Sequence, residues 1–141
     1  MPSSSKYLSA AAAVIILIAC IYFYKEYHRK PADVLSMQTF AVTDAMQLIN
    51  AFETNEATAN AKYLGKTIEV KGTVLEVVKQ ADTLINIFLG DHKQLNKVSC
   101  LVDAAHLKEY NQLKPGSICT IKGICTGYLM DVELNSCVII K

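Results

Sequence analysis

The stretch TIEVKGTVLEVV, residues 67–78, decides the fold of this chain, because its apolar and polar side chains alternate. Ile68, Val70 and Val74 fall on one side of an extended backbone together with Gly72, and hydroxyl or charged side chains fall on the other. This period of two predicts a half-buried β-strand. We expect Gly72 to mark a bulge or a sharp bend, as a strand needs when it curls around a small barrel.

More strands are predicted after this one, each bounded by turn residues. They lie at residues 84–89, 97–102, 117–126 and 132–140. Pro115 and Gly116 give a strong turn signal. Between the third and fourth strands, Asp103 is placed to cap a short helix at residues 104–110.

A helical pattern precedes the first strand. We expect a helix to begin near Thr43 or Asp44, where Asp44 and Gln47 have the spacing of a capping box. Its apolar stripe recurs at helical intervals and consists of Ala45, Leu48, Ile49 and Phe52. We expect Asn55 to break this helix, and residues 56–62 favour a second helical segment.

Two of the predicted strands share a short motif. The sequences GKTIEVKGTV (65–74) and GSICTIKGIC (116–125) each contain a turn glycine, a strand and a Lys-Gly pair. This similarity indicates that the first and fourth strands bend alike and lie side by side in a closed barrel. Five strands with a helix between the third and the fourth have the order of the OB-fold, a mainly β Greek-key barrel.

Several short segments resemble a known family. They are NEA (55–57), AKYLGK (61–66) running into IEVKGTV (68–74), KGICTG (122–127) and LNSC (134–137). Together they resemble the tRNA-anticodon-binding-like (tRNA_anti-like) OB family over residues 44–140. This family consists of small bacterial proteins of unestablished function, often with an N-terminal anchor or a lipoprotein signal. Its name reflects structural kinship with an anticodon-binding barrel, so the resemblance implies a fold and not an activity.

Most of the apolar excess lies near the N-terminus. Of 141 residues, 52% are hydrophobic and 19% are charged, and residues 7–24 (YLSAAAAVIILIACIYFY) carry no charge. A helix of that length spans about 27 Å, close to the hydrocarbon core of a bilayer. Aromatic and basic side chains follow where the helix would meet the headgroups: Tyr22, Phe23, Tyr24, Lys25, Tyr27, Arg29 and Lys30. We predict a tail at 1–6, a single-pass transmembrane helix at 7–24 in contact with membrane lipid, a linker at 25–42, and the OB-fold domain with its N-terminal helix at 43–141.

Three other interpretations of the apolar segment stay open. A buried core helix would also be apolar, although the terminal position and the charged flank favour the membrane. A cleaved secretory signal needs small residues followed by polar ones, unlike residues 21–24. Leu17-Ile18-Ala19-Cys20 resembles a bacterial lipobox, in which Cys20 would be acylated and would anchor the chain.

The distribution of charged residues helps to predict on which side of the membrane the domain lies and what kind of partner it binds. Lys25, Arg29 and Lys30 outnumber Lys6 across the apolar run, and the positive-inside rule alone places the domain in the cytoplasm. The exported setting implied by the resemblance favours the opposite, so we expect an extracytoplasmic, periplasmic domain. From Pro31 onward there are 10 Lys, no Arg and 12 Asp plus Glu. That composition is not typical of a dedicated nucleic-acid binder.

Four cysteines lie on predicted strands, at positions 100, 119, 125 and 137. Cys119 and Cys125 share a face with Ile121 and Gly123, which matches the apolar face of the first strand. We interpret the four as small buried side chains. A disulfide is the alternative in an exported domain, as Cys125–Cys137 or Cys100–Cys137. No pair has zinc-ligand spacing, so we expect no metal.

Catalytic motifs are missing from the sequence, and we expect neither an enzyme nor a cofactor. Glu69 and Glu76 are predicted on opposite faces of their strand and so cannot form an acid/base pair. His28, His92 and His106 are interpreted as surface side chains, since no carboxylate stands at metal-ligand spacing to them.

Binding is therefore the predicted activity. OB barrels bind ligands on the face of strands 2 and 3 and on the adjoining loops. Here the candidate residues are Lys79, Gln80, Asp82, Phe88, Lys93, Lys97 and Tyr128. Four further lysines could form a basic patch, which we interpret as a solvated face: Lys62, Lys66, Lys71 and Lys122. We predict a non-enzymatic, membrane-tethered module that binds a protein, peptide or small ligand, with single-stranded or tRNA-like nucleic acid as the alternative.

Overall fold

The computed structural model describes residues 4–27, 33–81, 84–103, 110 and 112–140. The chain forms two units, Met1–Pro31 and Ala32–Lys141. The first contains α1 (Ser4–Tyr27). The second contains β1 (Ala41–Asp44), α2 (Ala45–Thr54), α3 (Glu56–Tyr63), β2 (Thr67–Ala81), β3 (Leu84–Gly90), β4 (Val98–Asp103), β5 (Ile118–Tyr128) and β6 (Val132–Ile140).

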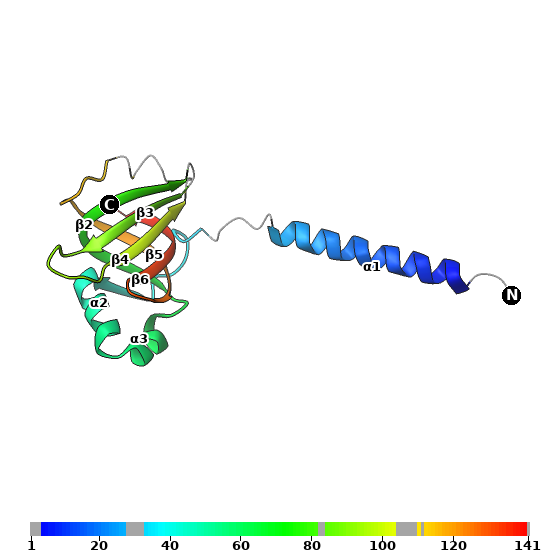
Figure 1. Cartoon of the computed structure of the whole chain (residues 1–141), viewed down its shortest axis with the longest axis horizontal. Coiled ribbons are helices and arrows are strands. Elements are labelled where there is room, and N and C mark those ends of the chain that lie inside the picture. The colour runs from blue at the N-terminus through cyan, green and yellow to red at the C-terminus, as the bar shows by residue number, and fades with distance from the viewer. Residues whose placement is uncertain (1–3, 28–32, 82–83, 104–109, 111, 141) are drawn as a thin grey trace. The chain divides into compact units, whose positions relative to one another are not determined.

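Five strands close into a barrel with the topology that the sequence predicts (Figure 1). The strands follow the order β2-β3-β4-β6-β5, and β5 returns to pair with β2. That last pairing is antiparallel, from Thr67 opposite Ile124 to Thr73 opposite Ile118. It confirms that the two strands with the shared motif lie side by side. The β4–β6 pair is parallel. The barrel is the Greek-key OB-fold.

The helices α2 and α3 share one capping residue. Asp44 caps α2, accepting a hydrogen bond from Met46 N at 2.9 Å. Asn55 then ends α2 through its own N–H, which bonds to Ala51 O at 3.2 Å. The Asn55 side chain accepts from Thr58 N at 3.0 Å and so begins α3. The apolar stripe of α2 is buried in the barrel core as predicted, with Ala45, Leu48, Ile49 and Phe52 at most 1% exposed.

The bulge expected at Gly72 lies elsewhere in β2, at Leu75, and a second register shift lies between Lys79 and Ala81. The β2–β3 register shifts between Val74 and Glu76, whereas Gly72 pairs regularly with Cys119. Gly72 serves close packing instead, because a Cβ built on it would lie 2.8 Å from the Ala45 Cβ. The bulge also reverses the alternation of faces. Glu76 consequently pairs with Phe88 on the outer face, the same side as Glu69, so the prediction of opposite faces was wrong.

Part of the expected linker packs on the barrel. Residues 33–40, which we call the strap, lie on the outer wall of β2 and β5, and Val34 is only 1% exposed. Lys122 Nζ donates to Met37 O at 2.5 Å, and Thr39 Oγ1 donates to Glu69 Oε1 at 2.5 Å. Residues 41–44 then form β1, a short strand parallel to β2 that the sequence did not predict. The structured domain therefore begins ahead of Thr43.

The N-terminal unit is helical over residues 4–27, where an anchor was predicted. Side chains are described there only from Ala13 to Lys25. Among the described residues, no helix is long and apolar enough to cross a membrane. Elsewhere in the chain, the helix expected at 104–110 falls almost wholly outside the described residues.

Candidate functional site

The outer surface of β3 and β4 carries a compact polar and aromatic group. Ile85, Ile87 and Leu89 alternate along β3 and are fully buried in the core. The residues between them, Asn86 and Phe88, therefore point outward. Across the ladder Phe88 pairs with Ser99 of β4. We call the group of Asn86, Phe88, Lys97 and Ser99 the β3–β4 face.

These four side chains contact one another in two pairs. The Lys97 Nζ lies 5.3 Å from the centroid of the Phe88 ring, within cation–π range. The Asn86 Nδ2 donates to Ser99 Oγ at 2.9 Å, and the Ser99 hydroxyl donates to Asn86 Oδ1 at 3.0 Å. Phe88 is half-buried, and Glu76 of β2 stands opposite it. The face thus combines a partly open ring, an ammonium group and a hydrogen-bonded amide.

The structure brings together Phe88 and Lys97 of the predicted ligand residues. Lys93 is exposed on the β3–β4 loop, where its N–H donates to Asp91 Oδ1 at 3.0 Å. Lys79 stands opposite Ile85, which points into the barrel, so Lys79 is on the other side of the sheet from Phe88. Gln80 is exposed, and Asp82 lies outside the described residues.

Tyr128 belongs to a different part of the surface. Its ring stacks on Phe52 of α2 with centroids 5.5 Å apart, and its hydroxyl accepts from Asn96 Nδ2 at 2.9 Å. One side of the ring is therefore already occupied. Asn86 and Ser99 were missed by sequence reasoning, although the spacing of Asn86 and Phe88 by two residues could have placed both on the same face.

The four lysines of the predicted basic patch have different environments. Lys62 and Lys66 stack on Tyr63 and Phe40, at 4.8 and 5.4 Å from the ring centroids. Lys122 is buried under the strap at 6% exposure. Lys71 is exposed on β2. The interpretation as a solvated face is wrong for Lys122, because the strap covers that part of β5.

All five cysteines are free thiols. The four on the barrel are buried, as predicted. Desolvation first, and then contact with Cys137, raises the pKa of the Cys100 thiol. Burial also raises the pKa of Cys119 to about 11, and desolvation raises that of Cys125. Such thiols stay protonated at neutral pH and are poor nucleophiles. The disulfide pairings stay a prediction.

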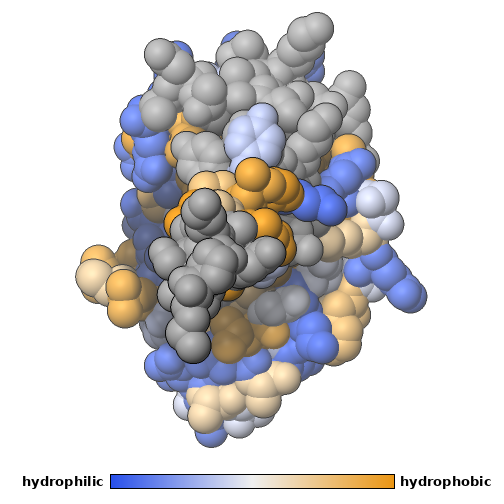
Figure 2. Space-filling view, turned by 90° about the vertical axis from the view of Figure 1, so that its right-hand side faces the viewer, coloured by the Kyte–Doolittle hydropathy of each residue, from blue (hydrophilic) through white to orange (hydrophobic). Residues whose placement is uncertain are grey.

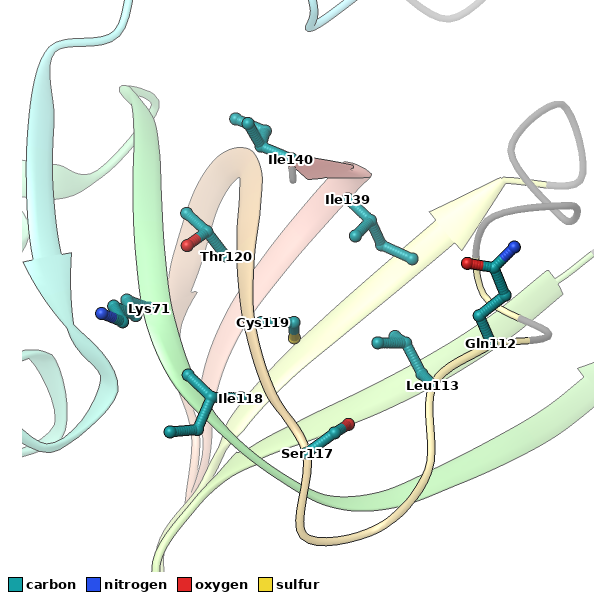
Figure 3. Close-up of a pocket in the computed structure, with 9 residues that line it drawn as sticks. All are labelled: Lys71, Gln112, Leu113, Ser117, Ile118, Cys119, Thr120, Ile139 and Ile140. Atoms are coloured by element: carbon teal, nitrogen blue, oxygen red, sulfur yellow. The ribbon is translucent and has the colours of Figure 1, made fainter.

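A pocket of about 370 Å³ opens beside Cys119 (Figure 3). Its walls come from β2, β5, β6 and the segment before β5. They are formed by Lys71, Gln112, Leu113, Ser117, Ile118, Cys119, Thr120, Ile139 and Ile140. The lining is mainly apolar, and the Cys119 thiol in it is protonated at neutral pH. The pocket therefore presents no reactive group.

Metal-ligating clusters do not occur among the described residues. His92 is exposed on the β3–β4 loop, and His28 and His106 lie outside the part of the chain that the structure describes. On the visible side of the molecule, hydrophobic residues are interspersed with hydrophilic ones (Figure 2).

Comparison with known proteins agrees with the fold. The model of the tRNA_anti-like family matches residues 1–138. The chain belongs to this family. A "putative nucleic acid-binding lipoprotein" from Klebsiella pneumoniae has a similar structure, with a TM-score of 0.59 and 24% identity. The likeness covers 79% of this chain and 100% of that one, and it shows the shared fold.

Two more distant likenesses have TM-scores below 0.5. The asparaginyl-tRNA synthetase of Entamoeba histolytica has a TM-score of 0.43 at 20% identity, over 54% of this chain and 21% of that one. OBody AM1L10, bound to hen egg-white lysozyme, has a TM-score of 0.43 at 17% identity, over 55% and 82%. At these scores neither bears on function. A comparison with curated proteins found no match.

Proposed function

We propose that this member of the tRNA_anti-like family is a non-enzymatic binding module, held at the membrane, whose ligand face is the β3–β4 face. The observation that carries the proposal is the Lys97 amine over the half-buried Phe88 ring, 5.3 Å from its centroid. An aromatic ring that is partly open to solvent, beside a cation, suits a flat or anionic group. The Asn86–Ser99 pair beside the ring is internally hydrogen-bonded, with Asn86 only 8% exposed and Ser99 half-buried, so it supports the face as a fixed polar group.

The ligand is proposed to be a small molecule, a peptide or a protein segment. Glu76, opposite Phe88, adds a negative charge to the face. That charge opposes a polyanion and leaves room for a ligand with one anionic group. The mildly acidic composition from Pro31 onward supports the same choice.

A photo-crosslinking amino acid at position 88 of the full, membrane-bound chain tests this face. We expect discrete adducts from position 88, and we expect them to disappear when Lys97→Ala is added. The matched control carries the crosslinker at Lys114, which is exposed on the loop before β5. Equal adducts at both positions, or adducts that are indifferent to Lys97→Ala, would refute the proposal.

Single-stranded nucleic acid is the second candidate, favoured by the same ring and cation. Base–aromatic stacking contributes about 1–3 kcal/mol per base, and the Klebsiella protein with this fold is described as nucleic acid-binding. Fluorescence anisotropy of a labelled oligothymidine, measured with the full chain in nanodiscs, tests whether the chain binds single-stranded nucleic acid. Tight, steeply salt-dependent binding that Phe88→Ala abolishes would establish this candidate, and no binding at low salt would exclude it.

Membrane tethering is proposed through the apolar run at residues 7–24. Consecutive apolar side chains of α1, from Val14 to Ile18, are 58–67% exposed, so every side of this segment is apolar. Such a helix needs an apolar environment. The Klebsiella protein is described as a "putative nucleic acid-binding lipoprotein", and that description supports an envelope location and an extracytoplasmic domain.

Two measurements test the tether. A reporter fused after Lys141 reports the compartment of the C-terminus, and a cytoplasmic signal would contradict the extracytoplasmic proposal. Mass spectrometry of the membrane-extracted chain distinguishes the anchors. A chain that still carries residues 7–24 fits a transmembrane helix, whereas a chain that begins at an acylated Cys20 shows that the lipid is the anchor.

A further inference from the structure

Two loops at one end of the barrel expose large apolar side chains. Leu95, on the β3–β4 loop, is 84% exposed, and Leu129 and Met130, in the β5–β6 turn, are 82% and 71% exposed. Leu95 and Leu129 are the two most exposed large apolar side chains among the described residues. We call Leu95, Leu129 and Met130 the apolar tip.

Backbone hydrogen bonds tie the two loops together. Val132 N donates to Lys97 O at 2.9 Å, and Lys97 N donates to Asp131 Oδ1 at 2.8 Å. Within the turn, Leu129 N donates to Asp131 O at 3.2 Å. The apolar tip is therefore carried by loops with a defined conformation.

Helix α2 braces the same loops. Asn96 Nδ2 donates both to Glu53 Oε1 at 2.6 Å and to the Tyr128 hydroxyl at 2.9 Å. The Tyr128 ring in turn stacks on Phe52. A surface that is ordered before binding loses little conformational entropy when a partner arrives.

The surroundings of the apolar tip are acidic. Desolvation first, and then the charges of Glu53, Glu56 and Asp131, raises the pKa of Tyr128, which shows that three carboxylates act at this position. The two loops, the adjoining helix ends and the start of β6 together carry five carboxylates: Glu53, Glu56, Asp91, Asp131 and Glu133. They carry two lysines, Lys93 and Lys97, and the Lys97 amine lies over Phe88.

We propose that the apolar tip and its acidic surroundings form a docking surface for a partner protein that presents apolar side chains flanked by lysine or arginine. Exposed apolar side chains that gather in one region mark interaction sites, and the hydrogen bonds between the two loops hold Leu95, Leu129 and Met130 at one end of the barrel. The negative charge selects a basic partner and opposes both nucleic acid and an anionic lipid surface. This surface adjoins the β3–β4 face at the backbone of Lys97, but the side chains of the apolar tip are not part of that face, so substitutions test the two separately.

The probe is a short fluorescent peptide in which lysine alternates with leucine, added to the full chain in phosphatidylcholine nanodiscs. Anisotropy is measured against empty nanodiscs. We expect saturable binding that weakens as salt increases. A peptide with glutamate in place of lysine should bind at least about tenfold more weakly.

Matched variants locate the binding. Leu95→Ser, Leu129→Ser and Met130→Ser combined should weaken binding at least about tenfold. The control is Val42→Ser with Ile118→Ser, which removes apolar side chains of similar exposure, 70% and 68%, elsewhere on the domain. This control should bind like the parent. Circular dichroism checks that both variants keep the fold.

Three outcomes would overturn the proposal. The tip variant could bind the lysine peptide like the parent, or the glutamate peptide could bind equally well. Alternatively, the tip variant could lose binding only to phosphatidylglycerol vesicles, which would make the apolar tip a lipid contact.

Discussion

Substituting Gly72 by alanine tests how α2 is seated on the barrel. The new Cβ would lie 2.8 Å from the Ala45 Cβ and 3.2 Å from the Leu89 Cβ. Carbon atoms prefer to be about 3.5–4.0 Å apart. The start of α2 must therefore move away from β2 by about 1 Å, because both colliding atoms are fixed to backbone.

The free energy of unfolding should fall as a result. Overpacking of a core costs about 1–3 kcal/mol, and replacing a strand glycine by alanine returns about 0.5–1 kcal/mol. The collision is the larger effect, so we expect Gly72→Ala to destabilise the domain by about 1–2 kcal/mol. Urea unfolding of the full chain in neutral detergent, followed by circular dichroism, measures this loss.

A double-mutant cycle with Ala45→Gly provides the control. Removing the Ala45 Cβ in the Gly72→Ala background takes away the closest contact, so the second substitution should restore stability there and reduce it in the parent. The coupling should exceed the roughly 0.3–0.5 kcal/mol within which independent sites add. The reasoning is refuted if Gly72→Ala is as stable as the parent, or if the two substitutions are additive.

Three other predictions concern the strap, a helix cap and a buried thiol. Lys122→Ala removes the ammonium that bonds to Met37 O, so we expect a loss of about 1–3 kcal/mol and faster proteolytic cleavage within the strap. Asn55→Ala removes the cap that accepts from Thr58 N, which should lower the urea midpoint by the equivalent of about 1 kcal/mol. The pKa of Cys119 rises from 9.0 to about 11 on folding. The contribution of its protonated thiol to the free energy of unfolding is therefore complete below pH 9 and is lost as pH rises from 9 toward 11. The free energy of unfolding should fall by about 2–3 kcal/mol over this range. Urea midpoints measured from pH 9 to pH 11 should show this fall, and the fall should be smaller in Cys119→Ala.

Each of these has a control and a contradicting result. Lys114→Ala removes an exposed lysine and should leave proteolysis unchanged. If Lys122→Ala is equally resistant, the strap is held by other contacts. Asn50→Ala, at an exposed position within α2, should be nearly neutral, and a similar loss at positions 50 and 55 would contradict the capping argument. If the urea midpoint of Cys119→Ala falls as steeply above pH 9 as that of the parent, groups other than Cys119 cause the fall.

The sequence predicted the barrel because burial alone sets the alternation in most strands. The prediction of the face on which Glu76 lies was wrong because of the sequence around the bulge. Residues 74–78 read VLEVV, with apolar side chains in both phases, so the pattern is compatible with either face for Glu76. Only the pairing with β3 decides between them.

The strap could not be predicted because its evidence is not local. Its residues show no periodicity, and the Lys122–Met37 contact joins positions 85 residues apart. The alternation correctly pointed Lys122 away from the barrel interior, yet that direction leads under the strap and not into water.

The candidate site was predicted in part. Phe88 and Lys97 come together because one points outward from β3 and the other ends the neighbouring loop. Lys79 and Tyr128 were grouped with them by loop membership alone. Lys79 lies near the start of β3, at the opposite end of that strand from the loop that carries Lys97. Tyr128 lies at the same end as Lys97, but its ring stacks on Phe52 and not on the β3–β4 face.

The strap has a mechanical consequence for a tethered protein. Residues 33–40 precede every strand of the barrel, so tension applied through the N-terminal segment reaches them first. Their attachments, from Met37 to Lys122 and from Thr39 to Glu69, lie on the outer wall. In the proposed membrane-tethered protein, tension from the N-terminal segment would load these two hydrogen bonds, and the one from Phe40 N to Thr67 O, before it loads the strands of the barrel.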